Sequence, residues 1–130
     1  MKTLLPPGWK APKGYANGIA ACGTLVFVAG QIGWTPDQTF ATDDFVGQAR
    51  QALQNVVAVL RQADAGPEHI VRMTWYVTDK QEYLGSLGAL GAAYREVIGT
   101  HYPAMTLVEV RGLAEDRAKV EIEATAVVPD

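Results

Sequence analysis

The sequence predicts an α+β fold in which two helices cover one face of a mixed β-sheet. Two amphipathic helical segments alternate with strand-like segments in the order ββαβαββ, and two helices can cover only one face of such a sheet. The last strand-like segment also separates apolar from polar side chains by strict alternation. A chain of 130 residues suits one hydrophobic core, so we expect residues 1–130 to form a single domain.

The first two strands are predicted from short apolar runs at residues 19–21 and 24–29. Cys22 and Gly23 separate the runs, and a two-residue connection ending in glycine is typical of a tight β-hairpin. We expect a loop over residues 30–41 to follow.

A long amphipathic helix is predicted after this loop. Thr42 is a favourable N-cap, and Asp43 and Asp44 in the first turn suit the helix dipole. Residues 66–67, Gly-Pro, are expected to end the helix. Its apolar stripe consists of Phe45, Ala49, Leu53, Val56, Leu60 and Ala63.

A strand and a second helix follow. Residues 70–78 alternate and are rich in β-branched and aromatic side chains, which favours a strand. The apolar face of this strand carries Val71, Met73, Trp75 and Val77, and its other face carries Arg72, Thr74, Tyr76 and Thr78. Asp79 with Glu82 resembles a capping box, and Gly99 stands where a C-terminal cap belongs. The predicted buried stripe of this helix is Tyr83, Leu87, Leu90, Tyr94 and Val97.

The last two strands are predicted at residues 105–110 and 119–128, with residues 112–117 as the turn between them. In the final strand, the helix-packed side is predicted to be Val120, Ile122, Ala124 and Ala126. The opposite side carries Glu121, Glu123, Thr125 and Val127. Together with Thr74 and Tyr76 these side chains form a semi-polar second face, which is more typical of a subunit interface than of bare surface. We therefore expect a homo-oligomer.

Composition excludes several functional classes. The net charge is −3 and the basic residues are dispersed, which argues against a nucleic-acid binder. Cys22 is the only cysteine, and His69 and His101 lack metal-binding spacing, so we expect no metal and no cofactor. The longest apolar run, residues 25–29, is far shorter than a membrane span, and we expect no signal peptide. A soluble, cytoplasmic protein is the expectation.

Five motifs, in order along nearly the whole chain, resemble those of the RidA (YjgF-type, L-PSP endoribonuclease-like) family. They are VAGQI at residues 28–32, QALQNV at 51–56, TWYVTD at 74–79, YPAMTLVEV at 102–110 and VEIEATAV at 120–127. The resemblance implies a chorismate-mutase-like fold, assembled as a homotrimer with a small-molecule cleft between each pair of subunits.

The resemblance also implies roles for particular residues. In deaminases of this family an arginine binds the carboxylate of a 2-imino acid, and a glutamate orients the attacking water. The glutamate falls on Glu121, the pocket glycine on Gly30, the cleft tyrosine on Tyr15, and the arginine on Met105. Gly91 replaces a polar helix residue that many members carry. The resemblance also implies that three neighbouring residues line the cleft, namely Gln31, Ile32 and Leu107.

Each of these residues also has a simpler interpretation. Glu121 could be a solvated carboxylate, Gly30 a turn glycine, Tyr15 a core-packing ring, and Met105 an apolar wall residue. A thioether cannot hold a carboxylate, so Met105 implies a less anionic or more apolar ligand than the deaminases take. A displaced cation is the alternative, and the candidates for it are Arg72 and Arg111; an interface ion pair is the commoner use of such residues.

These observations leave two functions open. The first is a deaminase-like hydrolase that acts on a reactive imine, enamine or related small metabolite, but not a standard 2-imino acid deaminase. The alternative is a non-catalytic module that binds or senses a small molecule. An endoribonuclease or translation inhibitor is least favoured, because the chain is acidic and has no basic patch.

Overall fold

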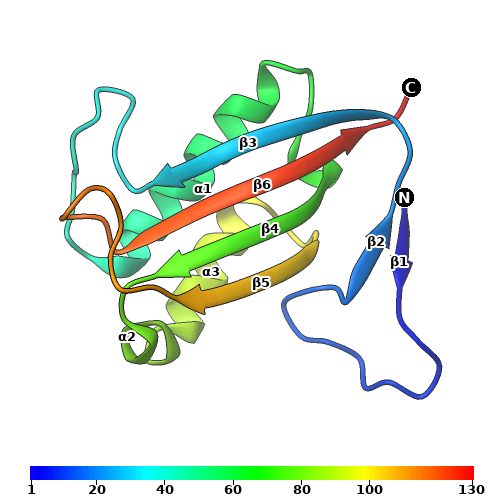
Figure 1. The fold of residues 1–130 in the computed structure, drawn as a ribbon, viewed down its shortest axis with the longest axis horizontal. Coiled ribbons are helices and arrows are strands. Elements are labelled where there is room, and N and C mark those ends of the chain that lie inside the picture. The colour runs from blue at the N-terminus through cyan, green and yellow to red at the C-terminus, as the bar shows by residue number, and fades with distance from the viewer.

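The centre of the structure, a computed structural model that describes residues 1–130, is a four-stranded mixed sheet in the order β3-β6-β4-β5 (Figure 1). Its strands are β3 (Thr24–Ile32), β6 (Val120–Val128), β4 (Ile70–Val77) and β5 (Ala104–Glu109). The helices α1 (Phe45–Arg61), α2 (Lys80–Leu84) and α3 (Leu87–Val97) lie behind one face of this sheet in Figure 1. The predicted α+β class, with helices on one face, is confirmed.

The predicted hairpin between the first two strands is wrong. The strand β2 (Gly18–Ala20) pairs instead with β1 (Lys2–Leu4) in a separate two-stranded sheet beside the main one. Gly23 has a φ of +147° and lies so close to the Val128 carbonyl that no Cβ would fit. The glycine therefore lets the chain enter β3 directly against the end of β6 instead of turning back along β2.

The predicted pairing of the last two strands is also wrong. β5 runs parallel to β4, with Met73 opposite Met105, and β6 inserts antiparallel between β3 and β4. Its helix-side residues are at most 5% exposed, as predicted: Val120, Ile122, Ala124 and Ala126. A strand this apolar is best buried between two neighbours, and that burial outweighs proximity along the chain.

The helix α1 begins and ends slightly inside its predicted limits. Asp44, not Thr42, is the N-cap: its carboxylate accepts from Gly47 N at 2.8 Å, while Thr42 Oγ1 accepts from Asp44 N at 3.0 Å. The helix ends at Arg61, before the Gly-Pro pair, and Ala63 lies exposed beyond it.

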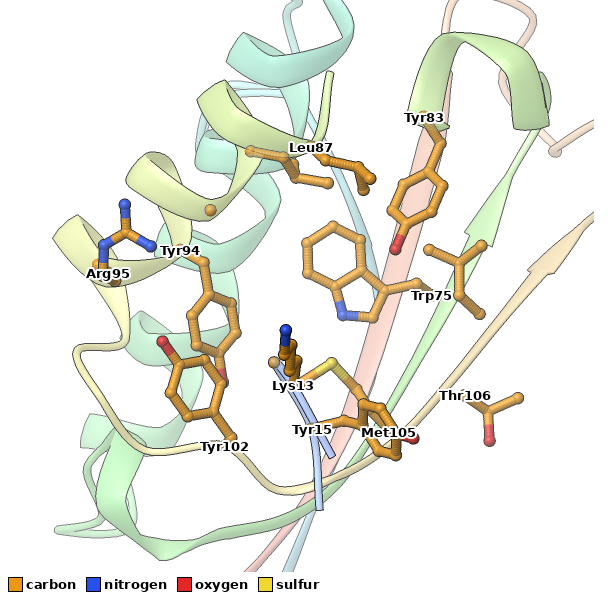
Figure 2. A pocket seen from close by; sticks show the side chains of 14 residues that line it. Lys13, Tyr15, Trp75, Tyr83, Leu87, Tyr94, Arg95, Tyr102, Met105 and Thr106 are labelled. Carbon is orange, nitrogen blue, oxygen red and sulfur yellow. The ribbon is translucent and has the colours of Figure 1, made fainter. Parts of the chain in front are cut away.

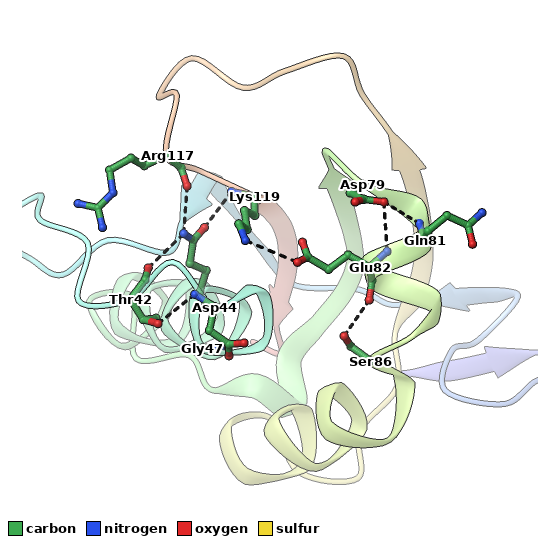
Figure 3. A network of polar contacts seen from close by, with 10 residues as sticks. Thr42, Asp44, Gly47, Asp79, Gln81, Glu82, Ser86, Arg117 and Lys119 are labelled. Carbon is green, nitrogen blue, oxygen red and sulfur yellow. Dashed lines mark hydrogen bonds and ion pairs between the residues drawn. The ribbon is translucent and has the colours of Figure 1, made fainter.

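A buried glutamine ties the start of α1 to the loop that enters β6 (Figure 3). Gln48 is 0% exposed; its Nε2 donates to Thr42 O at 3.2 Å and to Arg117 O at 3.0 Å, and its Oε1 accepts from Lys119 N at 2.8 Å. Lys119 Nζ also pairs with a Glu82 carboxylate oxygen at 3.5 Å. These contacts hold α1, α2 and the beginning of β6 in one arrangement.

The second predicted helix is divided in two. Asp79 caps α2 as expected, accepting from Gln81 N at 3.0 Å and Glu82 N at 3.2 Å, but α2 ends at Leu84, with Gly85 as its C-cap, and α3 begins after Ser86. Gly99 follows α3 with a φ of +92°, which confirms its capping position.

Two β-bulges adjust which side chains face the helices. The irregularity between Ile70 and Arg72 buries Ile70 completely and leaves Val71 half-buried, contrary to the predicted alternation. The second bulge lies between Val28 and Gln31 and contains Gly30.

No helix of the structure is both long and apolar enough to cross a membrane.

Candidate functional site

A cavity of about 500 Å³ lies between α3, β5 and the loop that precedes β2 (Figure 2). Its walls come from three parts of the chain and are mainly apolar and aromatic. They consist of Lys13, Gly14, Tyr15, Trp75, Tyr83, Leu87, Leu90, Gly91, Tyr94, Arg95, Tyr102, Met105, Thr106 and Leu107. We call this space the aromatic cavity.

Four predicted cleft residues meet in the aromatic cavity: Tyr15, Gly91, Met105 and Leu107. The strand pairing explains two of them. Met105 and Leu107 lie opposite Met73 and Trp75 of β4, which are buried on the helix side of the sheet. Residues two apart on a strand share a face, so both β5 side chains project toward α3.

The other predicted residues lie elsewhere. Glu121 is paired with Tyr76 of β4. Alternation along β6 places its side chain on the face of the sheet that the helices leave uncovered, which we call the open face. Gly30 approaches it so closely that an added Cβ would overlap the Glu121 carboxylate. Gln31 and Ile32 belong to the same end of β3, where Ile32 O accepts a hydrogen bond from Asn55 Nδ2 at 3.1 Å. None of these four lines the aromatic cavity.

Within one chain, therefore, the predicted site is divided. Met105 faces the helices, whereas Glu121 and Gly30 face the opposite side of the same sheet. A sheet separates the two groups, so a single chain does not bring the Glu121 carboxylate to the aromatic cavity.

The positive charges of the cavity also differ from those considered in the sequence. Arg72 lies on the open face beside Phe27 and Glu123, and Arg111 is exposed; neither lines the aromatic cavity. Lys13 and Arg95 do, and the lining contains no acidic residue. The aromatic cavity therefore carries Met105 together with two positively charged side chains, Lys13 and Arg95.

Sequence reasoning missed most of the aromatic wall. Trp75 was predicted as part of a strand's apolar face, and Tyr83 and Leu87 as part of a helix stripe. In the structure Leu87 is 52% exposed and lines the cavity with Tyr83 and Trp75. Apolar periodicity identifies a helix face but does not distinguish a cavity wall from a core.

Two tyrosines form the wall nearest the last turn of α3. The rings of Tyr94 and Tyr102 stack with centroids 5.3 Å apart, and Tyr94 donates its hydroxyl to His101 O at 2.6 Å. Burial raises the pKa of Tyr94 well above its usual range, and the neighbouring Tyr102 adds to the effect. His101 Nε2 lies 2.6 Å from Ile70 O, so this imidazole is tied to the start of β4.

The open face carries exposed apolar side chains around a polar centre. Phe27 is 73% and Leu25 58% exposed on β3. Beside them Tyr76 donates to Glu123 Oε1 at 2.7 Å. This hydrogen bond raises the pKa of the Tyr76 hydroxyl; partial burial and the negative charges of Glu123 and Glu121 act in the same direction, and Arg72 opposes them.

The structure contains no group of three or more His, Cys, Asp or Glu side chains that could hold a metal ion. The chemistry available at the aromatic cavity is therefore that of tyrosine hydroxyls, an indole N–H and two cationic side chains.

Comparison with known proteins identifies the family. The model of the family described as Endoribonuclease L-PSP matches residues 8–128. TdcF of Escherichia coli K12 is 33% identical over 130 residues, covering 98% of this chain and 95% of TdcF. The 2-iminobutanoate/2-iminopropanoate deaminase of Salmonella typhimurium LT2 is 35% identical over 116 residues, covering 87% of this chain and 86% of the enzyme.

Solved structures agree with this assignment. The Rid protein YyfB of Yersinia pestis, whose function is described as unknown, superposes with a TM-score of 0.87 at 26% identity, covering 98% of both chains. Escherichia coli TdcF with bound serine gives a TM-score of 0.69 at 32% identity, covering 94% of this chain and 92% of TdcF. This chain thus belongs to the Endoribonuclease L-PSP family, the family of the Rid and YjgF proteins.

Proposed function

We propose that this protein is a homotrimeric, deaminase-like hydrolase that acts on a reactive imine or enamine in an intersubunit cleft. The observation that carries the proposal is the division of the site between the two faces of the sheet. The aromatic cavity holds Tyr15, Gly91, Met105 and Leu107, while Gly30 and Glu121 lie together on the open face. In a ring of subunits, Glu121 of the partner subunit would complete the cavity of its neighbour.

The open face supports the assembly. Phe27 and Leu25 are large apolar side chains that a monomer would leave in water, and they flank the polar pair of Tyr76 and Glu123. Burial of exposed aromatic residues around satisfied polar contacts is typical of subunit interfaces.

In the proposed reaction, water attacks the carbon of the C=N bond. The Glu121 carboxylate accepts a proton from this water and passes it to the substrate nitrogen. The C–N bond of this carbinolamine then breaks as its hydroxyl proton passes to the nitrogen through the same carboxylate, releasing ammonia and a carbonyl product. An enamine would first take a proton on carbon to become the imine, after which the same hydrolysis applies.

The substrate is expected to differ from those named for the Salmonella relative. That relative is described as a deaminase of 2-iminobutanoate and 2-iminopropanoate, which are small carboxylates. Met105 offers no bidentate partner for such a carboxylate, and nine of the fourteen residues that line the cavity are hydrophobic. We therefore expect weak turnover of small aliphatic 2-imino acids.

Ammonia release from imines generated in situ by an amino-acid oxidase tests the proposal. Glu121→Gln should lower the rate on the order of a hundredfold, because a positioned general base contributes about that much. Glu115→Gln, in the exposed turn before β6, is the matched control and should leave the rate unchanged. A Glu121→Gln rate equal to that of the wild type would show that Glu121 has no part in hydrolysis.

A non-catalytic binding module is the second candidate. It is favoured by Met105, whose thioether gives the cavity no charged group for a carboxylate. For this candidate, thermal-shift screening should find stabilising ligands while no imine is hydrolysed faster than in buffer. Ribonuclease activity has less support, since the chain has a net charge of −3 and no histidine lines the cavity.

We place the protein in the cytoplasm, because its one cysteine, Cys22, is exposed and unpaired, which suits a reducing compartment. Cell fractionation tests this placement.

A further inference from the structure

The indole N–H of Trp75 is a buried hydrogen-bond donor without an acceptor. Trp75 is 4% exposed, and its Nε1 has no hydrogen-bond partner in the chain. Buried polar groups are nearly always partnered, because a buried donor without an acceptor destabilises the folded state. The indole nitrogen can only donate, so it requires an acceptor atom.

The acceptor can reach this nitrogen only from the aromatic cavity. Trp75 is part of the cavity wall, and Figure 2 shows the nitrogen edge of its indole turned toward the region between Lys13 and Met105. Met105 projects into the same region without accepting from it. The Nε1 atom itself has less than 1 Å² of accessible surface, so a bound molecule would meet this donor once the Met105 side chain beside it shifts.

The rest of the wall suits a flat apolar group. Tyr83 and Leu87 lie on one side of Trp75, and the stacked rings of Tyr94 and Tyr102 lie on the other (Figure 2). A cavity of about 500 Å³ accommodates a ring-bearing metabolite, and aromatic walls favour such a ring.

The charge of the cavity suits an acid group. Lys13 and Arg95 are the charged residues of the lining, and neither forms an ion pair within the chain. In the view of Figure 2, Lys13 lies beside the nitrogen edge of the indole, and Arg95 lies on the α3 side of the cavity with its Nη1 next to Gly91.

We propose that the aromatic cavity binds aromatic carboxylates, with a carboxylate oxygen accepting from Trp75 Nε1 and pairing with the Lys13 ammonium. An indole N–H and an ammonium thus hold the acid group in place of a guanidinium at position 105. The inference rests on the proposed function, since the same cavity would hold the imine, and it narrows the substrate class to imines that carry an aromatic ring and an acid group.

Isothermal titration with three probes separates these contributions. Phenylacetate has the ring, the acceptor oxygen and the charge; phenylacetamide lacks the charge; acetate lacks the ring. We expect phenylacetate to bind most tightly, phenylacetamide about fivefold more weakly, and acetate at least about tenfold more weakly than phenylacetate.

Two substitutions assign the contacts. Trp75→Phe keeps a ring but removes the donor, and should weaken both phenyl probes by about tenfold. Lys13→Gln should weaken phenylacetate by about fivefold and leave phenylacetamide unchanged. The matched control is Lys10→Gln, three residues earlier in the same loop and outside the cavity lining, which should change neither affinity.

Because Trp75→Phe also leaves a void, a measurement on the wild-type protein supports the test. Phenylacetate should shift the indole N–H resonance of Trp75 downfield in a ¹⁵N-labelled sample, while the resonance of Trp34, which lies outside the cavity, stays in place. An unmoved Trp75 resonance at saturation, or acetate binding as tightly as phenylacetate, would overturn the inference.

The result of these binding experiments does not depend on whether the protein hydrolyses imines. If phenylacetate binds as described but no imine is hydrolysed, the proposed enzymatic function is wrong and the ligand class stands. If imines are hydrolysed but neither phenyl probe binds, the ligand class is wrong and the enzymatic function stands.

Discussion

The carboxylate of Glu121 occupies the space in which a Cβ atom on Gly30 would lie. The β-bulge between Val28 and Gln31 brings the glycine to this position, so the strand and the carboxylate fit only because residue 30 has no side chain. Gly30 is therefore more than a turn glycine: it fixes where the Glu121 carboxylate can be.

Gly30→Ala should impair hydrolysis with little effect on folding. The new methyl group would displace the flexible Glu121 side chain, not backbone, so we expect a change in stability within about 1 kcal/mol. Imine hydrolysis should fall about tenfold or more, since a small displacement of a catalytic group has that effect. Chemical denaturation and the ammonia assay measure the two quantities.

The matched control for this substitution is Gly88→Ala in α3, where an added Cβ meets nothing within 4 Å. It should leave the rate unchanged and stabilise the helix by up to about 1 kcal/mol. Full activity in Gly30→Ala would mean that the position of the Glu121 carboxylate is unimportant.

Gln48→Leu should be strongly destabilising. The substitution keeps the volume but leaves Thr42 O, Arg117 O and Lys119 N without their partner inside the structure. Buried groups that lose their hydrogen bonds cost about 1–3 kcal/mol each before relaxation, so we expect a loss of about 2–4 kcal/mol in urea unfolding. Gln54→Leu, on the exposed side of the same helix, should change stability by less than about 0.5 kcal/mol.

Phe27→Glu should prevent subunit assembly. Phe27 is 73% exposed on the open face, and a carboxylate there would be buried near Glu123 in the proposed homotrimer. Light scattering coupled to size exclusion should give a trimer mass for the wild type and a monomer mass for the variant. Val59→Glu, at a 40% exposed site on α1, is the control and should remain trimeric; a monomeric wild type would contradict the assembly.

The elements of the fold could be predicted from the sequence, but their pairing could not. Alternation in residues 119–128 correctly identified the helix side of β6, because local periodicity directly reflects burial. The position of β6 between β3 and β4 depends on which strands gain most from two neighbours, a property of the whole sheet. The β2–β1 pairing likewise follows from the close approach of Gly23 to Val128, which no local pattern reveals.

The site was predictable to a similar extent. Motif resemblance led to Tyr15, Met105 and Leu107, which the structure brings together. Alternation in the final strand placed Glu121 on the face away from the helices, but neither the motifs nor the alternation showed that Met105 faces the helices, so the division of the site between two faces was not predicted. Trp75 was missed because its ring fits an apolar strand face; only its unpartnered nitrogen distinguishes it from a core residue.

Tyr94 should make stability depend on alkaline pH. Its pKa is raised by burial in the folded state, so above about pH 10 the unfolded chain loses a phenol proton that the folded chain keeps. The unfolded state then binds fewer protons, and the free energy of unfolding falls as pH rises. Urea unfolding at about pH 8 and about pH 11 should show a smaller fall in Tyr94→Phe than in the wild type. Equal falls would indicate that Tyr94 ionises normally.

Met105→Arg should increase the hydrolysis of small aliphatic 2-imino acids. Position 105 projects into the aromatic cavity beside Tyr15 and Leu107, so a guanidinium there could hold a carboxylate in bidentate fashion. A charge-assisted pair of this kind corresponds to about tenfold in kcat/KM, and the ammonia assay with imines of alanine and 2-aminobutyrate measures it. Met105→Leu preserves volume and charge and should leave the rate at the wild-type level. Two results together would contradict this prediction: Met105→Arg leaves kcat/KM for small 2-imino acids unchanged, and Glu121→Gln still lowers turnover of other imines. Residue 105 would then serve the cavity only as an apolar wall, and the acid group would be bound by Lys13 and Arg95.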